Sequence, residues 1–365
     1  MKKIVLFAFL AIGLVSCKST RIGSTGHANL KYLDDYVIAE DLEVSGTKVG
    51  GLSGIDYQDE TYYMVSDDPS RPRLYKARIV INDGQIDSVQ ISEVIKLQFD
   101  SLLENAHLDM ESLLYDKAKE KFIISSEGYI NEGKDPMIFM VSKNGKFEDS
   151  FNLPENFLAE SSKGPRNNGT LEGLTNSHDN KGVWAAMELP LKTDGPKPKV
   201  IRTKSPVRIT YFDKKTGMAT KQFPYRLEPI AKIPWMYFAV NGVTDLLEYA
   251  PDRFLVLERG FAAGHGSNGN TVRIFDVDAS LATNTLDRNN LNVTFYNPAK
   301  KTLLYDFKWA KKYLTEEIID NIEGITFGPV LQNGKQSIIL ISDNNFNSLG
   351  RQLNQVILLE FEPKN

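Results

Sequence analysis

Pairs of acidic residues recur along this chain, and each pair frames one segment of hairpin size. The most complete pair is Glu172 and Glu188. Two other acidic pairs follow the same pattern, Glu111 with Glu127 and Glu323 with Asp343. In two further pairs only the second residue is an acid: Ser53 with Asp67, and Thr244 with Glu258. Carboxylates gathered in one place bind hard cations, and Ca²⁺ takes roughly six to eight oxygen ligands in flexible geometry. These residues can therefore bind a cation, provided that the fold brings them together.

An internal repeat predicts that the fold does so. Each copy has an apolar strand start, a turn and a second strand that ends in an acid, and the copies begin at residues 52, 110, 171, 243 and 322. A strand repeat of this length is typical of a propeller or a solenoid. Because the two strands run antiparallel, the start of the first lies beside the end of the second. Five copies then place the acids around one mouth of a central channel.

The remaining strand signals predict four strands in each copy, which is one propeller blade. Continuous apolar runs are followed by alternating strands and then by a fourth strand, as in residues 183–187, 207–212 and 222–227. The last copy ends with three strands, and residues 30–39 can supply the missing one. We therefore predict an all-β fold, a β-propeller of five four-stranded blades closed by the N-terminal strand. A sixth blade could lie only in residues 191–244, and the best helix candidate is residues 310–321.

The N-terminus has the pattern of an exported lipoprotein. Residues 4–15 are apolar, too short for a mature membrane span, and residues 14–17 resemble the lipobox of bacterial lipoproteins. We expect residues 1–16 to be a signal peptide, 17–28 a polar tether from lipidated Cys17, and 29–365 a single propeller domain. The alternative is a plain secretory signal with an incidental cysteine. The expected location is the bacterial cell envelope, periplasmic or surface-exposed, on a lipid anchor.

Charge and cysteine content exclude other classes. The formal net charge is −4, and residues 1–16 carry two lysines and no acid, so the remainder is more acidic. A mildly acidic protein is a poor partner for nucleic acid, and we expect none. Cys17 is the one cysteine in the chain, which rules out an intramolecular disulfide. We expect a monomer that meets the membrane only through its anchor.

Acids brought so close cannot all ionise without compensation by a cation, by arginines or by protonation. Four arginines lie in loops near the repeated motifs: Arg73, Arg166, Arg259 and Arg351. They could pair the acids structurally or bind an anionic substrate, and both interpretations stay open. Any single acid could also serve only to accept backbone hydrogen bonds from a neighbouring blade.

Other catalytic chemistry has little support. The four histidines show no zinc-binding spacing. The segment 264–269 resembles a hydrolase elbow but lacks its first glycine, since His265 stands there, so a serine esterase using Ser267 and His265 is a weak hypothesis. A basic insertion carries Lys192, Lys197, Lys199, Arg202 and Lys204, which either face solvent or attract phosphate or a membrane surface.

The ordered set of motifs resembles the bacterial phytase-like family, whose members are described by an esterase-like activity of phytase. The resemblance covers roughly residues 48–362. It is carried by residues 51–56 with 66–68, 109–111 with 126–127, 168–174, 257–261 with 272–274, and 322–325 with 342–346. Two departures are Ser112, which replaces a glycine, and Thr244-Asp245, which replaces a Glu-Gly pair. The motifs of the six-bladed Ca²⁺-dependent phytases are not found.

The resemblance implies hydrolysis of phosphate or carboxylic esters. Our leading hypothesis is a metal-assisted ester hydrolase acting on a small anionic ester, with Ca²⁺ as the cation; the rival is a non-catalytic propeller that binds a ligand or protein partner on the same face. The residues assigned are, for catalysis, Glu172, Glu111, Glu323, Arg259 and Arg166; for substrate binding, Asn168, Arg73, Asn344 and Asn345; and for the metal, Asp67, Glu127, Glu188, Glu258 and Asp343.

Overall fold

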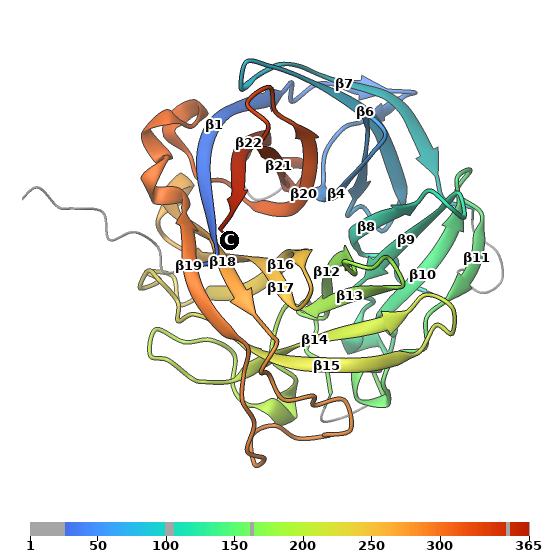
Figure 1. Cartoon of the computed structure of the whole chain (residues 1–365), viewed down its shortest axis with the longest axis vertical. Coiled ribbons are helices and arrows are strands. Elements are labelled where there is room, and N and C mark those ends of the chain that lie inside the picture. The colour runs from blue at the N-terminus through green and yellow to red at the C-terminus, as the bar shows by residue number, and fades with distance from the viewer. Residues whose placement is uncertain (1–25, 99–105, 161–163, 348–350, 365) are drawn as a thin grey trace, which may run out of the picture.

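Five four-stranded antiparallel sheets form a ring around a central axis (Figure 1). The computed structural model describes residues 26–98, 106–160, 164–347 and 351–364. Each sheet is one blade, so the protein is a five-bladed β-propeller, as the repeat predicts. Cys17, the tether up to residue 25 and the segment 99–105 lie outside the described residues.

The strands follow one another blade by blade. The first blade is β4 (Leu52–Gln58), β5 (Thr61–Ser66), β6 (Arg73–Asn82) and β7 (Gln85–Lys96). The second is β8 (Met110–Asp116), β9 (Lys121–Ser126), β10 (Met137–Ser142) and β11 (Phe147–Ser150), and the third is β12 (Leu171–Asn176), β13 (Gly182–Met187), β14 (Pro206–Asp213) and β15 (Ala219–Arg226). The fourth is β16 (Ala239–Ala250), β17 (Arg253–Ala262), β18 (Asn270–Asp278) and β19 (Lys300–Asp306), and the fifth contains β20 (Ile322–Val330), β21 (Gln336–Ser342) and β22 (Asn354–Pro363). A small hairpin, β2 (Glu43–Val44) with β3 (Thr47–Lys48), precedes the first blade.

The N-terminal strand closes the ring. β1 (Ala28–Ile38) pairs antiparallel with β22, from Ala28 opposite Pro363 to Ile38 opposite Asn354. It therefore becomes the outer strand of the fifth blade, which the C-terminal residues alone leave with three strands. Predicted for residues 30–39, this closure is confirmed with a shift of one or two residues. It also pairs the edge of β22, a largely buried strand that would otherwise be the edge of the sheet.

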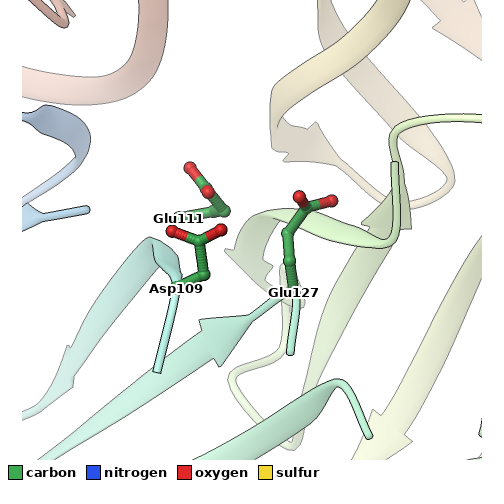
Figure 2. Close-up of side chains that lie close together, drawn as sticks. All are labelled: Asp109, Glu111 and Glu127. Carbon is green, nitrogen blue, oxygen red and sulfur yellow. The ribbon is translucent and has the colours of Figure 1, made fainter. Parts of the chain in front are cut away.

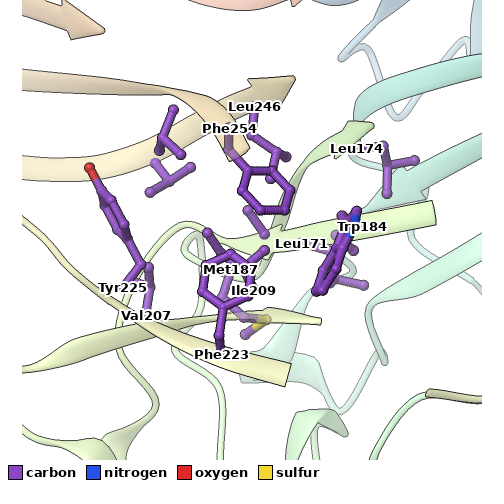
Figure 3. Close-up of a cluster of buried hydrophobic side chains, with 14 of the residues drawn as sticks. Leu171, Leu174, Trp184, Met187, Val207, Ile209, Phe223, Tyr225, Leu246 and Phe254 are labelled. Carbon is purple, nitrogen blue, oxygen red and sulfur yellow. The ribbon is translucent and has the colours of Figure 1, made fainter. Parts of the chain in front are cut away.

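Apolar packing between neighbouring blades holds the ring together. In the third blade, the apolar run of β13 places Trp184 against Phe254 of the fourth blade, with ring centroids 5.3 Å apart and nearly perpendicular (Figure 3). Phe223 packs against both rings. Edge-to-face contacts of this kind stabilise beyond the area that they bury. Because each blade packs on its two neighbours, the positions of the inner strands around the axis are fixed.

The inner strands of neighbouring blades pack closely against one another just below the channel mouth. A Cβ on Gly173 would lie 2.5 Å from Cα of Asp245, and one on Gly54 would lie 2.7 Å from Cα of Ser112. Ser112 and Asp245 occupy the same position in their own blades, and their side chains accept backbone hydrogen bonds from neighbouring strands, at Leu174 and Ile325. The two departures from the family pattern thus place hydrogen-bonding side chains between neighbouring inner strands.

The predicted helix at residues 310–321 is wrong. The segment forms two 3-10 turns, η6 (Lys311–Tyr313) and η7 (Thr315–Glu317), separated by extended backbone at Leu314. Leu314 and Ile319 are buried against the fifth blade, and packing there overrides the helical spacing of the apolar residues. Among the described ranges, no helix is long and apolar enough to cross a membrane.

Candidate functional site

A cavity of about 1150 Å³ opens at the end of the ring where the first strand of each blade begins. Its acidic lining residues come from the first, second, third and fifth blades: Asp67, Asp109, Glu111, Glu172, Glu188, Asp320, Glu323 and Asp343. Six of these are residues that the repeat singled out. Asp109 and Asp320 were not assigned, although each stands one or two residues before the first strand of its copy. Including the two residues before each first strand in the repeat would have identified both acids.

One backbone hydrogen bond, repeated in four blades, brings the acids together. The N–H of Glu127 donates to Asp109 O at 2.8 Å, and that of Glu188 to Thr170 O at 2.7 Å. The equivalent bonds run from Asp67 to Gly51 O and from Asp343 to Asn321 O, each at 2.9 Å. Each bond extends the pairing of the two inner strands by one residue. The acid after the second strand is thereby held beside the residues that open the first.

In the fourth blade this position is basic. Gly242 pairs with Arg259, so Arg259 takes the place of the strand-end acid. Glu258, expected there, is one residue too early and its side chain lies away from the cavity. It accepts hydrogen bonds from Tyr225 Oη at 2.6 Å and Lys301 Nζ at 2.7 Å. The expected position of Glu258 at the channel mouth is therefore wrong, because Glu258 precedes the site position by one residue and successive side chains of a strand point to opposite faces.

Arg259 is the positive charge in the ring of acids. Its Nη2 donates to Glu323 Oε1 at 2.6 Å, while its buried Nε has no hydrogen-bond partner among the described residues. Burial by itself lowers the pKa of the guanidinium, but Glu323, Glu188 and Glu172 outweigh burial and raise it. Arg259 thus stays charged, and its buried Nε–H is left without a partner among the described residues.

Two overlapping groups of carboxylates have the spacing of a metal site. Oxygen atoms of Asp109, Glu111 and Glu127 lie within 4.8 Å of one another (Figure 2), and so do those of Glu127, Glu172 and Glu188. Glu127 belongs to both groups, and its Oε1 also accepts the N–H of Thr170. The second group is fully buried, whereas Asp109 and Glu111 are partly exposed to the cavity.

The carboxyl groups on this floor have raised pKa values. Burial is the largest cause for each, and it raises the pKa of Asp109 to about 6 and, together with neighbouring acids, that of Asp67 to about 7. The pKa of Glu188 is about 7 and that of Glu127 about 8, with Glu188 the main neighbouring charge for Glu127. For Glu111 and Glu172, burial and then adjacent acids raise the pKa well above its ordinary range.

The Glu127, Glu172 and Glu188 group fits a hard divalent cation. Its donors are all carboxylate oxygens, which suit Ca²⁺ or Mg²⁺ rather than a soft metal. Within the described part of the chain, Glu188 Oε2 is buried without a hydrogen-bond partner. A buried carboxylate oxygen left unpaired is costly, and a cation ligand would satisfy it.

Two of the assigned arginines serve the scaffold. Arg166 donates to the carbonyls of Pro190 at 2.9 Å and Gly195 at 2.8 Å, and it does not line the cavity. Arg73 is buried and donates to Asp68 Oδ2 at 3.0 Å and Tyr75 Oη at 2.7 Å. The expectation that these residues reach the anion is not met by their positions, because nearby carbonyl and side-chain acceptors hold them.

Of the remaining polar residues, some line the cavity and one holds a loop behind it. Asn168 and Asn345 line the cavity, and Arg351 lies at its rim paired with Glu316. Asn344 is buried, and its Oδ1 accepts the N–H of Gly51 at 3.2 Å. Asn344 therefore fixes the loop behind the acids rather than facing a ligand.

The loop with the incomplete elbow motif also reaches the cavity, where Ser267 is a lining residue. His265, however, lies against the Trp235 ring with centroids 5.1 Å apart, and its Nε2 is 2.9 Å from Ile233 O. The imidazole is thus engaged by the 233–238 segment and not by Ser267. The hypothesis of a serine–histidine pair has no support in this geometry.

Comparison with known proteins identifies a sequence family. The profile of a family described as phytase-like, with esterase-like activity of phytase, matches residues 47–346. No curated protein sequence is significantly similar to the chain.

Solved structures are only distantly similar to the chain. The allergen Mala s 1 of Malassezia sympodialis has 11% identity and a TM-score of 0.41, over 88% of this chain and 82% of that chain. A bifunctional GH43-CE protein of Bacteroides eggerthii has 10% identity and a TM-score of 0.42, over 86% of this chain but only 33% of its own. A luciferin-regenerating enzyme has 12% identity and a TM-score of 0.38, over 90% and 94% of the two chains. At such low similarity, these matches say nothing about what the chain does.

The raised pKa values predict how stability depends on pH without metal. The folded protein holds protons on Asp109, Asp67, Glu188 and Glu127 up to about pH 6 to 8, whereas the unfolded chain releases them near pH 4. Folding then binds protons in this window, so the free energy of unfolding falls as the pH rises from about 5 to 8. Urea denaturation in the presence of a chelator measures it.

The control for this prediction removes one titrating group. Glu172→Gln keeps the side-chain shape and should make the fall with pH shallower. Acids with lowered pKa, such as Asp179 at about 2, titrate below the window and do not contribute to it. A free energy of unfolding that stays constant or increases between pH 5 and 8 would show that these acids are ionised in the folded protein.

Proposed function

The chain belongs to the phytase-like family, and from this premise we propose that it is a hydrolase of phosphate or carboxylic esters that acts on the floor of the acidic cavity. The observation that carries the proposal is the convergence of buried acids from four blades on one charged arginine. Perturbed pKa values in a cavity are typical of acid–base chemistry. The family match supports the proposed reaction class, and the lining of the cavity supports the choice of residues.

We further propose that Glu127, Glu172 and Glu188 hold a divalent cation, with Ca²⁺ the best match to their all-oxygen donors. A bound cation of this kind polarises an ester oxygen and neutralises developing negative charge. The acids must lose protons to bind it, so the affinity should increase with pH. The partly exposed Asp109 and Glu111 then remain to move protons.

The proposed reaction uses one water molecule for each ester. The water oxygen forms a bond to the carbonyl carbon or to phosphorus, and Asp109, whose pKa is about 6, takes the proton that the water loses. The guanidinium of Arg259 donates to the oxygen that gains negative charge. The ester bond to the alcohol oxygen then breaks, and Glu111, whose pKa is raised by burial and by adjacent acids, gives that oxygen its proton. The products are an acid and an alcohol.

Removing the cation should reduce both activity and stability. With a chelator, hydrolysis of p-nitrophenyl phosphate or acetate should fall by about 10²-fold and return with Ca²⁺. Because a cation that binds only the folded state stabilises it, Ca²⁺ at about a hundredfold excess over Kd should add about 2.7 kcal/mol to the free energy of unfolding. Thermal melts with Ca²⁺ or chelator measure this gain.

Glu172→Gln should weaken both responses, while Glu120→Gln, on an exposed hairpin with Lys143, should leave them unchanged. If neither ester is hydrolysed and the melting temperature does not change with Ca²⁺, the results would favour the rival hypothesis, a propeller that binds a ligand without catalysis.

The proposed base is tested separately. Asp109→Asn keeps the side-chain volume and removes the proton acceptor, so kcat should fall by about 10² to 10⁴-fold. The acidic limb of the pH–rate profile, expected near the Asp109 pKa of about 6, should also disappear. The Ca²⁺-dependent rise in melting temperature should survive, since Asp109 is not among the three proposed ligands. An unchanged kcat would remove Asp109 from the mechanism.

We also propose that a lipid on Cys17 anchors the protein in the bacterial cell envelope. The described structure places the start of β1, at Ala28, at the end of the fifth blade opposite the cavity, because β1 runs antiparallel to β22. An anchor at that end leaves the cavity open to substrate. Cys17→Ser should move the protein from the membrane to the soluble fraction, or block its maturation, and leave the activity of the folded domain intact. Soluble, folded Cys17→Ser protein without activity would contradict this role.

A further inference from the structure

The wall of the cavity beside the fourth blade is apolar, unlike its floor. Met236, Phe238, Phe261 and Ala263 line it. Met236 and Phe238 are 69% and 58% exposed although both are large and apolar. A soluble protein rarely leaves contiguous apolar side chains open to water without a function for them. This wall is therefore a candidate for contact with a ligand.

The segment that carries the wall is held in a defined position. The N–H of Trp235 donates to Ala263 O and the N–H of Ala263 donates to Phe238 O, both at 2.9 Å. Phe238 also packs near Phe261, with ring centroids 6.3 Å apart. The apolar side chains are thus displayed by backbone pairing with the end of β17.

The apolar wall continues directly from the proposed reaction centre. Arg259 and Phe261 both line the cavity and are two residues apart in β17, so their side chains lie on one face of the strand. Their separation along the strand is about 7 Å. An ester oxygen held by Arg259 therefore places the adjoining part of the molecule against Phe261, Met236 and Phe238.

The charge of the cavity limits how many anionic groups a ligand can carry. Over the described residues, eight carboxyl side chains line it, against the three basic residues Lys197, Arg259 and Arg351. Three basic side chains can pair with few phosphate groups, so a ligand with many phosphates would leave most of them without a cationic partner. A neutral or singly anionic ester needs only one such partner.

We propose that the substrate is an ester with one ester group and an apolar alkyl or aryl arm, and that Met236, Phe238 and Phe261 form the subsite for this arm. The inference rests on the proposed ester hydrolase function and specifies its substrate class. It excludes polyphosphorylated compounds as preferred substrates. Affinity should increase about fourfold for each methylene group that becomes buried on the wall.

Two series of compounds test the subsite. The first compares kcat/KM for p-nitrophenyl acetate, butyrate and hexanoate, with Ca²⁺ present. The second measures, by calorimetry, the binding of methyl-, butyl- and hexylphosphonate, which cannot be hydrolysed as esters. In the native protein, both kcat/KM and affinity should rise with chain length, and inositol hexakisphosphate should bind more weakly than hexylphosphonate.

Variants on the same segment provide the matched comparison. Met236→Ser and Phe238→Ser should each lower kcat/KM for the hexanoate ester and the affinity for hexylphosphonate by at least about tenfold. The values for the acetate ester and methylphosphonate should stay unchanged. Tyr237→Ser is the control, because Tyr237 lies between them, is fully exposed and does not line the cavity. Its series should match that of the native protein. Because all three side chains are exposed, the substitutions should fold, which melting temperatures check.

The outcomes separate this inference from the function on which it rests. Hydrolysis without a chain-length preference, or an equal loss in the Tyr237→Ser control, overturns the subsite and leaves the hydrolase proposal standing. If no ester is hydrolysed, the hydrolase proposal fails and the phosphonate series alone decides the subsite. Phosphonates that do not bind, or that bind without regard to chain length, overturn it. Preferred binding of inositol hexakisphosphate overturns it as well.

Discussion

The site depends on holding together carboxylates that repel one another and lose their hydration. The force that holds them is the pairing of the two inner strands in each blade. One extra backbone bond, such as that from Glu188 N–H to Thr170 O, extends this pairing by one residue and fixes each acid at the mouth. Blade packing, as between Trp184 and Phe254, fixes the angle between neighbouring pairs. The cost of concentrating these charges appears as raised pKa values, which a cation could relieve.

The fourth blade differs from the other four, and this difference makes the lining of the cavity asymmetric. Its strand-end residue is Arg259 instead of an acid, and its loops carry apolar side chains such as Phe238. The acidic floor therefore faces an apolar wall, with the guanidinium at their boundary. The same blade contributes Asp245, whose buried carboxyl group accepts the backbone N–H groups of Leu246 and of Ile325 in the neighbouring inner strand. A symmetric ring of acids would lack this difference between floor and wall.

Much of this arrangement could be predicted from the sequence because it follows from periodicity. The five copies gave the blade number, and the missing fourth strand of the last copy gave the closure by β1. Prediction failed where a position depends on partners distant in the chain. Glu258 resembled the other strand-end acids, but it lies one register position too early, so its side chain points to the other face of β17 and contacts Lys301. Arg73 and Arg166 were near the motifs in sequence, yet their partners are acceptors behind the site. The apolar wall of Met236 and Phe238 carries no repeat signal at all.

The central claim is that the inner-strand pairing assembles a cation site from acids of neighbouring blades. Crystals grown with Ca²⁺ or Tb³⁺ test it by anomalous diffraction, which locates the ion itself. The account predicts an anomalous peak at the cavity floor, about 2.3 to 2.6 Å from carboxylate oxygens of Glu127, Glu172 and Glu188. A floor without a peak at saturating cation, or peaks confined to other parts of the surface, would contradict it.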